Sequence, residues 1–129
     1  MRKTILMVML AVVSGPAAAE WIIAAETSEA VSYFNPATIR RSGDTAKMWR
    51  VMAFKVPRRS AKGKMYWSSK TQDEFDCKNE RWRSLYLSLH FGKMGDGETV
   101  FSFTDTDEWT PIVPDSLAEA NWKIACAKK

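Results

Sequence analysis

The sequence has few of the residues on which most enzymes depend for catalysis and metal binding. Its 129 residues include one histidine, His90, and two cysteines. A single histidine excludes multi-histidine metal sites and most histidine-based catalytic triads. The chain also has no glycine-rich phosphate loop, no H-E-x-x-H motif and no G-x-S-x-G nucleophile elbow. We therefore expect a non-enzymatic protein without a metal or a cofactor.

One route to catalysis stays open, because a group of acidic residues could supply the paired carboxylates of a glycoside hydrolase. These residues are Asp73, Glu74, Asp76 and Glu80. Their alternation with Phe75 and Cys77 is also what a half-exposed strand produces, and we favour that structural interpretation. His90 falls on the polar side of an amphipathic strand, where we expect it to be solvated.

Long apolar runs are also missing, and the apolar segment at the N-terminus is too short to cross a membrane. Residues 5–13 are apolar, follow two basic residues and precede a Ser-Gly-Pro break and three alanines. This pattern is typical of a cleavable secretory signal peptide, whereas a membrane span needs about 20 apolar residues. We predict a signal peptide at residues 1–19, cleavage after Ala19 and one mature domain at residues 20–129.

The predicted cleavage site and the two cysteines define the expected location and chemistry of the mature protein. No cysteine adjoins Ala19, so we expect no lipid anchor and a periplasmic or secreted protein. In an oxidising compartment, an even pair such as Cys77 and Cys126 indicates a disulfide. This bridge would close a loop of about 50 residues and stabilise the fold by roughly 4 kcal/mol on the loop-entropy model. The alternative, a catalytic thiol activated by His90, would leave the other cysteine idle.

Basic residues are concentrated in one part of the chain. The formal net charge of +4 is too weak to indicate nucleic-acid binding, but residues 45–72 contain no acidic residue at all. The hairpin loop expected at residues 55–64 is either solvated by its charges or docks an acidic partner, such as a heparin-like glycan, an acidic protein segment or anionic lipid. The candidate partner-binding residues are Arg58, Arg59, Lys62 and Lys64, with Arg40 and Arg41 as a second basic site.

Tryptophan is abundant, with six residues in the chain. We assign Trp49 and Trp122 to the core between sheet and helix, where large aromatic side chains fill space. Trp67 and Trp109 lie near expected loops, and we predict that they are exposed anchors of an interface.

Most of the mature chain has the period-two pattern of β-strands. Strands are expected at residues 21–25, 30–34, 45–54 and 84–91, in a long stretch that opens at Met65, and in a returning strand through Phe101 and Phe103. Pro57 should end the third strand. The glycine-rich segment 92–97 predicts a hairpin loop. In the strand at 84–91 the leucines and Phe91 share one face, and His90 lies on the other.

The last segment changes to a helical period. Ser116 and Glu119 match a capping box, in which Ser116 accepts from the third helical N–H and Glu119 reaches back to the N–H of Ser116. A broad apolar side follows, while Glu119 and Lys123 can pair on the opposite side. The fold class is therefore α+β: an antiparallel sheet with a C-terminal helix across one face, joined by Cys126 to the strand of Cys77.

Three blocks of residues resemble the surface-adhesin protein E family. They are YFNPATIRRSG at residues 33–43, EFDCKNER at 74–81, and the segment 108–126 that ends in EANWKIAC. The resemblance implies a curved antiparallel sheet of about six strands with a helix tethered by the Cys77–Cys126 disulfide. It also implies possible homodimers and binding of host matrix proteins such as vitronectin or laminin. The alternative function is a periplasmic accessory or inhibitor protein that binds an envelope enzyme or an anionic glycan.

Overall fold

The computed structural model describes residues 20–128, so the predicted signal peptide and its cleavage site lie outside the described residues. Strands and helices follow one another as the sequence pattern predicts, with two short extra strands. Their bounds are β1 (Ile22–Glu26), β2 (Ala30–Phe34), the 3-10 helix η1 (Pro36–Thr38), β3 (Arg40–Ser42), β4 (Thr45–Arg59), β5 (Met65–Asp76), β6 (Arg81–His90), β7 (Thr99–Phe103), β8 (Thr110–Pro111) and α1 (Leu117–Ala127).

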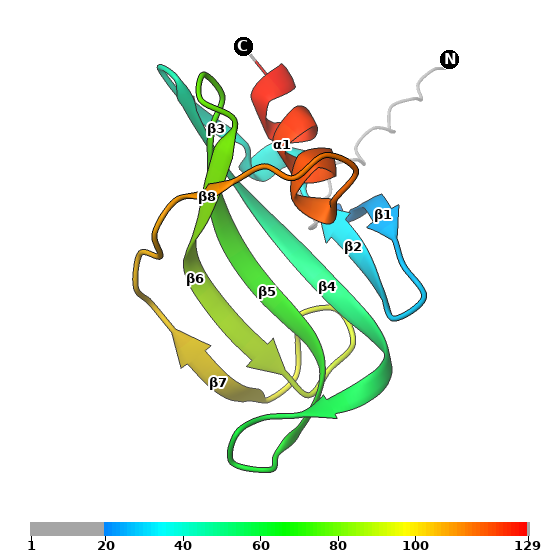
Figure 1. Ribbon diagram of the computed structural model, residues 1–129. Coiled ribbons are helices and arrows are strands. Elements are labelled where there is room, and N and C mark those ends of the chain that lie inside the picture. The colour runs from blue at the N-terminus through cyan, green and yellow to red at the C-terminus, as the bar shows by residue number, and fades with distance from the viewer. Residues whose placement is uncertain (1–19, 129) are drawn as a thin grey trace, which may run out of the picture.

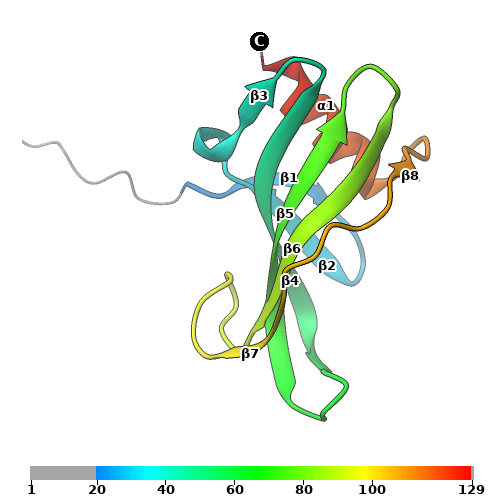
Figure 2. The same cartoon turned by 90° about the vertical axis from the view of Figure 1, so that its left-hand side faces the viewer.

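The strands form one antiparallel sheet with the order β1-β2-β4-β5-β6-β7. Short strands extend it at one end, where β3 pairs with β4 and β8 pairs with β6 (Figure 1). Seen edge-on, the sheet is strongly twisted and α1 lies on one side of it (Figure 2). The predicted α+β class, with six main strands and a C-terminal helix on one face, is confirmed. We call the side that carries α1 the α1 face and the other side the open face.

The hydrophobic core lies beneath α1, at one end of the sheet. Its buried residues are Ile39, Ala46, Met48, Phe75 and Ala125. Trp122 packs against this cluster, as predicted, and the disulfide between Cys77 and Cys126 fixes the end of the helix to the end of β5. The β4–β5–β6 strands continue well beyond the helix, so no other element of residues 20–128 forms a second layer on the α1 face of their far half.

The start of α1 differs in one hydrogen bond from the predicted capping box. Ser116 Oγ accepts from the backbone N–H of Glu119 at 3.1 Å, as expected. The Glu119 carboxylate, however, accepts from the backbone N–H of Asp115 at 2.9 Å, one residue before the predicted donor. Asp115 has a positive φ of 63°, which turns its N–H toward the helix.

Two predictions about the strands are wrong. Strand β4 does not end before Pro57 but runs through it to Arg59, because the register with β5 shifts between Ala53 and Arg58. Such an irregularity places proline where no ladder hydrogen bond is required. Trp49 does not fill the space under α1, since it lies on the open face, half-buried, with its ring centroid 5.3 Å from that of Tyr86.

Candidate binding surfaces

The basic residues predicted to bind a partner form two separate groups. Arg40 and Arg41 lie in β3, which pairs with the first residues of β4. The other group, on the β4–β5 hairpin, lies at the far end of the sheet (Figure 1). The 15 residues of β4 separate the two groups by roughly 40 Å. The six basic side chains therefore do not form one docking site.

Arg41 is engaged with the C-terminal end of α1. Its Nη1 donates to the carbonyl oxygens of Cys126 and Lys128, both at 2.9 Å, and its Nε donates to the carbonyl of Gly43. These carbonyls lie where a helix leaves acceptors unsatisfied and carries partial negative charge. Arg41 thus ties β3 to the helix, whereas, within residues 20–128, the neighbouring Arg40 bonds only to the nearby carbonyls of Ala37 and Ile39.

The basic hairpin, defined as Arg58, Arg59, Lys62 and Lys64, is partly neutralised. Arg58 contacts Glu29 at 3.2 Å and lies 4.2 Å from the centroid of the Phe54 ring. Arg59 donates to the carbonyl of Gly63 inside the loop, and Lys64 lies 3.8 Å from Glu98. Lys62 is exposed and makes no ion pair within residues 20–128. Arg59 and Lys62, which form no ion pair within residues 20–128, therefore remain free to attract an external anion.

The two tryptophans predicted to be exposed anchors are half-buried beneath cations. Lys93 Nζ lies 4.6 Å from the Trp67 ring centroid. The guanidinium groups of Arg81 and Arg83 lie 4.7 and 4.1 Å from the centroid of Trp109. Each ring offers only part of its surface to a partner, because cation–π contacts occupy a face.

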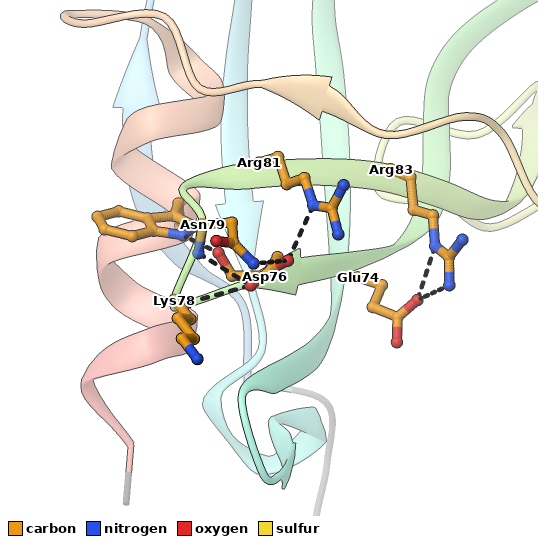
Figure 3. Close-up of polar contacts among 7 residues, drawn as sticks. Glu74, Asp76, Lys78, Asn79, Arg81 and Arg83 are labelled. Carbon is orange, nitrogen blue, oxygen red and sulfur yellow. Dashed lines mark hydrogen bonds and ion pairs between the residues drawn. The ribbon is translucent and has the colours of Figure 1, made fainter.

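Of the four acidic residues that could supply a catalytic pair, Asp73 and Glu74 lie on opposite faces of the sheet, whereas Glu74 and Asp76 share the open face and each pairs with an arginine. Asp73 lies on the α1 face, 2.5 Å from Arg50 Nε and almost fully buried. Burial raises the pKa of Asp73, and the charge of Arg50 opposes that rise. The next residue, Glu74, lies on the open face and pairs with Arg83 at 2.8 Å (Figure 3). Neighbouring strand residues point to opposite faces, so these two carboxylates cannot share a substrate.

Asp76 closes the turn between β5 and β6 (Figure 3). Its carboxylate accepts from the backbone N–H groups of Lys78 and Asn79, from Asn79 Nδ2, and from Arg81 Nε at 2.8 Å. Burial raises the pKa of Asp76, but the hydrogen bonds from Asn79, Arg81 and the turn backbone outweigh it and lower the pKa to about 2. The carbonyl of Asp76 accepts from Trp122 Nε1 at 3.0 Å, which links the turn to α1.

His90 is buried, and the prediction that it is solvated is wrong. Only 8% of the residue is exposed, because the 92–97 loop folds over the open face, where Ser68 Oγ binds the backbone of Gly92 and Gly95. This loop, in yellow, lies on the other side of the sheet from α1 (Figure 2). His90 Nε2 lies 2.7 Å from Ser88 Oγ. Burial, followed by the nearby charge of Lys70, lowers the pKa of His90, so the ring is neutral at pH 7.

The Ser88 and His90 pair lacks the third member of a catalytic triad. No carboxylate among the described residues hydrogen-bonds to His90, whose Nδ1 is buried without a partner. Ser88 itself is 1% exposed, so its hydroxyl is closed to a substrate. The pair instead fills the wall of a groove.

The open-face groove has a volume of about 400 Å³. It is formed by β4, β5 and β6 together with Trp21, which precedes β1, and the η1 segment. Its lining residues are Trp21, Asn35, Thr38, Trp49, Lys70, Tyr86, Ser88 and His90. The sequence pattern did not predict that these residues form a groove. The period-two pattern assigns Trp49, Lys70 and Tyr86 each to one face of its own strand. Only the pairing of the three strands shows that this is the same face of the sheet.

A second surface, which we call the apolar stripe, lies on the α1 face beyond the helix. It consists of Leu87, Leu89, Phe101 and Phe103. The register of β6 and β7 places Leu87 opposite Phe103 and Leu89 opposite Phe101, which agrees with the predicted common face for Leu87 and Leu89. Leu85 lies at a shift in the register between β5 and β6, and Phe91 follows the end of β6. The two phenylalanines are each 47% exposed, because α1 does not reach this half of the sheet.

Within residues 20–128, no group of three or more histidine, cysteine or acidic side chains could hold a metal ion. The part of the chain that the structure describes also contains no helix long and apolar enough to cross a membrane.

An open sheet with a disulfide-tethered helix, an exposed apolar stripe and an aromatic groove is typical of a binding module. The profile of the family described as surface-adhesin protein E matches residues 21–127, and the chain belongs to this family. Family membership supports an adhesin-like, non-enzymatic role for an exported protein.

Solved structures with the same fold include Haemophilus influenzae protein E. One structure aligns with a TM-score of 0.66 at 13% identity, covering 89% of this chain and 91% of that chain. A second crystal form gives a TM-score of 0.64 at 12% identity, with 81% and 91% covered. Protein E from non-typeable H. influenzae gives 0.59 at 13% identity, with 88% and 82% covered. The comparison with curated protein sequences found no match.

Proposed function

We propose that this protein is an exported adhesin-like module that docks a protein partner through the apolar stripe. Family membership supports the adhesin-like role, and the observation that carries the choice of surface is the exposure of Phe101 and Phe103. Each is 47% exposed on a strand that ends the sheet. An edge strand offers unpaired backbone groups, and exposed aromatic residues are the usual anchors of an interface.

The partner class that we propose is a host extracellular matrix protein such as vitronectin or laminin. The apolar stripe offers hydrophobic contact, and the basic hairpin at the same end of the sheet adds positive charge (Figure 1). Positive charge near an apolar centre speeds the approach of an acidic partner and fixes its orientation.

Binding to immobilised vitronectin and laminin, measured by biolayer interferometry, tests this proposal. The double variant Phe101→Ser/Phe103→Ser should weaken binding by at least about tenfold, because a few buried aromatic anchors carry most of the energy of an interface. Val113→Ser is the matched control, since Val113 is 60% exposed and lies outside the stripe. Wild-type affinity in the double variant would show that the partner binds elsewhere.

The family resemblance also predicts a homodimer, and the same stripe is a surface through which two copies could pair. Sedimentation velocity over a range of concentrations distinguishes the two roles. A dimer that dissociates in the double phenylalanine variant assigns the stripe to self-association. A protein that remains monomeric assigns it to a foreign partner.

A second candidate function is a periplasmic accessory or inhibitor protein that binds an envelope enzyme or an anionic glycan through the basic hairpin. It is favoured by Lys62, which is exposed and makes no ion pair within residues 20–128. We expect Arg58→Glu/Arg59→Glu to abolish retention on heparin at low salt, because such binding is electrostatic and is screened by salt. If the wild-type protein is not retained either, the hairpin is only a solvated loop.

A further inference from the structure

The open-face groove has aromatic walls that neither the apolar stripe nor the basic hairpin uses. Trp21, Trp49 and Tyr86 line it, and the rings of Trp49 and Tyr86 meet edge to face at 5.3 Å with an interplanar angle of 62°. The volume of about 400 Å³ falls in the range of small-molecule sites. The groove is therefore large enough for one or two sugar rings, and three of its lining side chains are aromatic.

The hydrogen-bonding groups left free in the groove are mostly donors. Asn35 Oδ1 already accepts from the backbone N–H of Ala37. The hydroxyl of Thr38 donates to the carbonyl of Asn35 and accepts from the N–H of Trp49. Ser88 Oγ and His90 Nε2 pair with each other at 2.7 Å, and the buried Nδ1 of His90 has no partner among the described residues. The side-chain NH₂ of Asn35 and the ammonium of Lys70 have no hydrogen-bond partner within residues 20–128. A ligand rich in acceptor oxygens would complement them.

The positive charge in the groove also favours a ligand with acceptor oxygens. Lys70 lines it, and no carboxylate among the described residues pairs with Lys70 or lines the groove. Elsewhere on the open face, Arg81 and Arg83 are neutralised by Asp76 and Glu74. The neutral ring of His90 adds no second charge. The Asp96 carboxylate of the covering loop acts on His90 through its charge but forms no ion pair with Lys70 among the described residues. The ammonium of Lys70 therefore remains available to a ligand with one negative charge.

We propose that the open-face groove binds a sugar that carries a carboxylate, such as a hexuronate. The sugar's C–H faces stack on Trp21, Trp49 and Tyr86, its hydroxyl oxygens accept from Asn35, and its carboxylate pairs with Lys70. This site lies on the opposite face of the sheet from the apolar stripe and does not depend on the protein-docking role. It also differs from the basic hairpin, which has charge but no aromatic groove.

Titration of the purified full chain with glucuronate and galacturonate, followed by NMR, tests the site. The indole N–H resonances of Trp21 and Trp49 should shift with the acidic sugars, and these resonances are assigned with Trp→Phe variants. Glucose should bind at least about tenfold more weakly, because it lacks the group that pairs with Lys70. Acetate at the same concentration should leave the indole resonances unchanged.

Lys70→Gln should weaken glucuronate binding about tenfold, whereas Lys123→Gln, on the exposed side of α1, should not change it. The proposal is overturned if neither acidic sugar shifts the indole resonances, if glucose binds as tightly as glucuronate, or if Lys70→Gln keeps wild-type affinity. Because Lys70 is a half-exposed side chain without a partner in the described residues, its replacement should leave the fold intact, and the unchanged amide spectrum of the variant verifies this.

Discussion

The Asp76 carboxylate accepts hydrogen bonds from two backbone N–H groups, an amide side chain and a guanidinium. The residue is 5% exposed, so its charge would be costly without these donors. They hold the turn after β5 in the position that lets the Asp76 carbonyl accept from Trp122. A single side chain thus couples the end of one strand, the turn and the helix.

We predict that Asp76 makes the protein sensitive to acid. Its pKa is about 2 in the folded protein and 3.8 in the unfolded chain, so the unfolded state binds more protons at low pH. The resulting stability is fully present above about pH 4 and is lost as the pH falls through about 2. Asp76→Asn should cost about 2 kcal/mol at neutral pH and flatten this acid decline, measured by urea unfolding at several pH values.

The matched control for this experiment is Glu74→Gln, which removes a neighbouring carboxylate on the same strand and leaves Asp76 in place. It should retain the decline between pH 4 and pH 2. A decline that is equally steep in Asp76→Asn would mean that another group governs the acid response.

At the scale of the element, α1 is held at its C-terminal end by two independent connections. One is the disulfide to Cys77, and the other is the Arg41 side chain, which donates to the carbonyls of Cys126 and Lys128. The helix has only 11 residues, a length at which isolated helices are marginal in water. Its stability therefore depends on packing and on these connections.

Arg41→Gln should destabilise the protein by about 1–2 kcal/mol, because carbonyls at the end of α1 lose charged hydrogen bonds. The adjacent Arg40→Gln is the control and should cost less than about 0.5 kcal/mol, since Arg40 bonds only to its own loop. Chemical denaturation of both variants measures the difference. Equal losses would remove the assigned role of Arg41.

The disulfide should contribute more than the arginine. Its loop of 49 residues predicts a loss of about 4 kcal/mol for Cys77→Ser/Cys126→Ser. Guanidinium unfolding of this double variant, compared with the reduced wild-type protein, measures the contribution. If both remain as stable as the oxidised protein, the bridge does not restrict the unfolded chain.

At the scale of the whole molecule, the two halves of the sheet are stabilised unequally. The half beneath α1 contains the buried core of Ala46, Met48 and Phe75. The other half carries exposed side chains such as Val56, Phe101 and Phe103. The half without a helical layer is the one that bears the apolar stripe and the basic hairpin, so the surfaces proposed for binding lie where the fold has least packing.

We predict that hydrogen exchange differs along the single strand β4. Amides at residues 46–51 should exchange at least about 100-fold more slowly than those at 56–59, because they open only when the core beneath α1 unfolds. Native-state exchange followed by NMR measures both groups in one sample. Uniform protection along β4 would mean that the two halves unfold together.

The sequence by itself determined the class of the fold and its covalent closure. Period-two patterning predicted the main strands, the Ser116 cap predicted the start of α1, and two cysteines in an exported chain predicted the disulfide. The strands and the helix cap depend on residues close together in the chain. The disulfide follows because Cys77 and Cys126 are the two cysteines of the sequence. The family blocks at residues 33–43, 74–81 and 108–126 added the family, which the profile match over residues 21–127 confirms.

Only the tertiary structure decided which faces are buried and which side chains meet. The polar pattern around His90 predicted solvent, but the 92–97 loop covers that face. Phe101 and Phe103 of β7 stay exposed because α1 does not extend over them. The sequence predicted Arg41 as a residue that binds a partner, but in the structure its side chain donates to the carbonyl of Cys126 at the end of α1. Burial and charge pairing depend on segments far apart in the chain, and a local pattern carries no information about them.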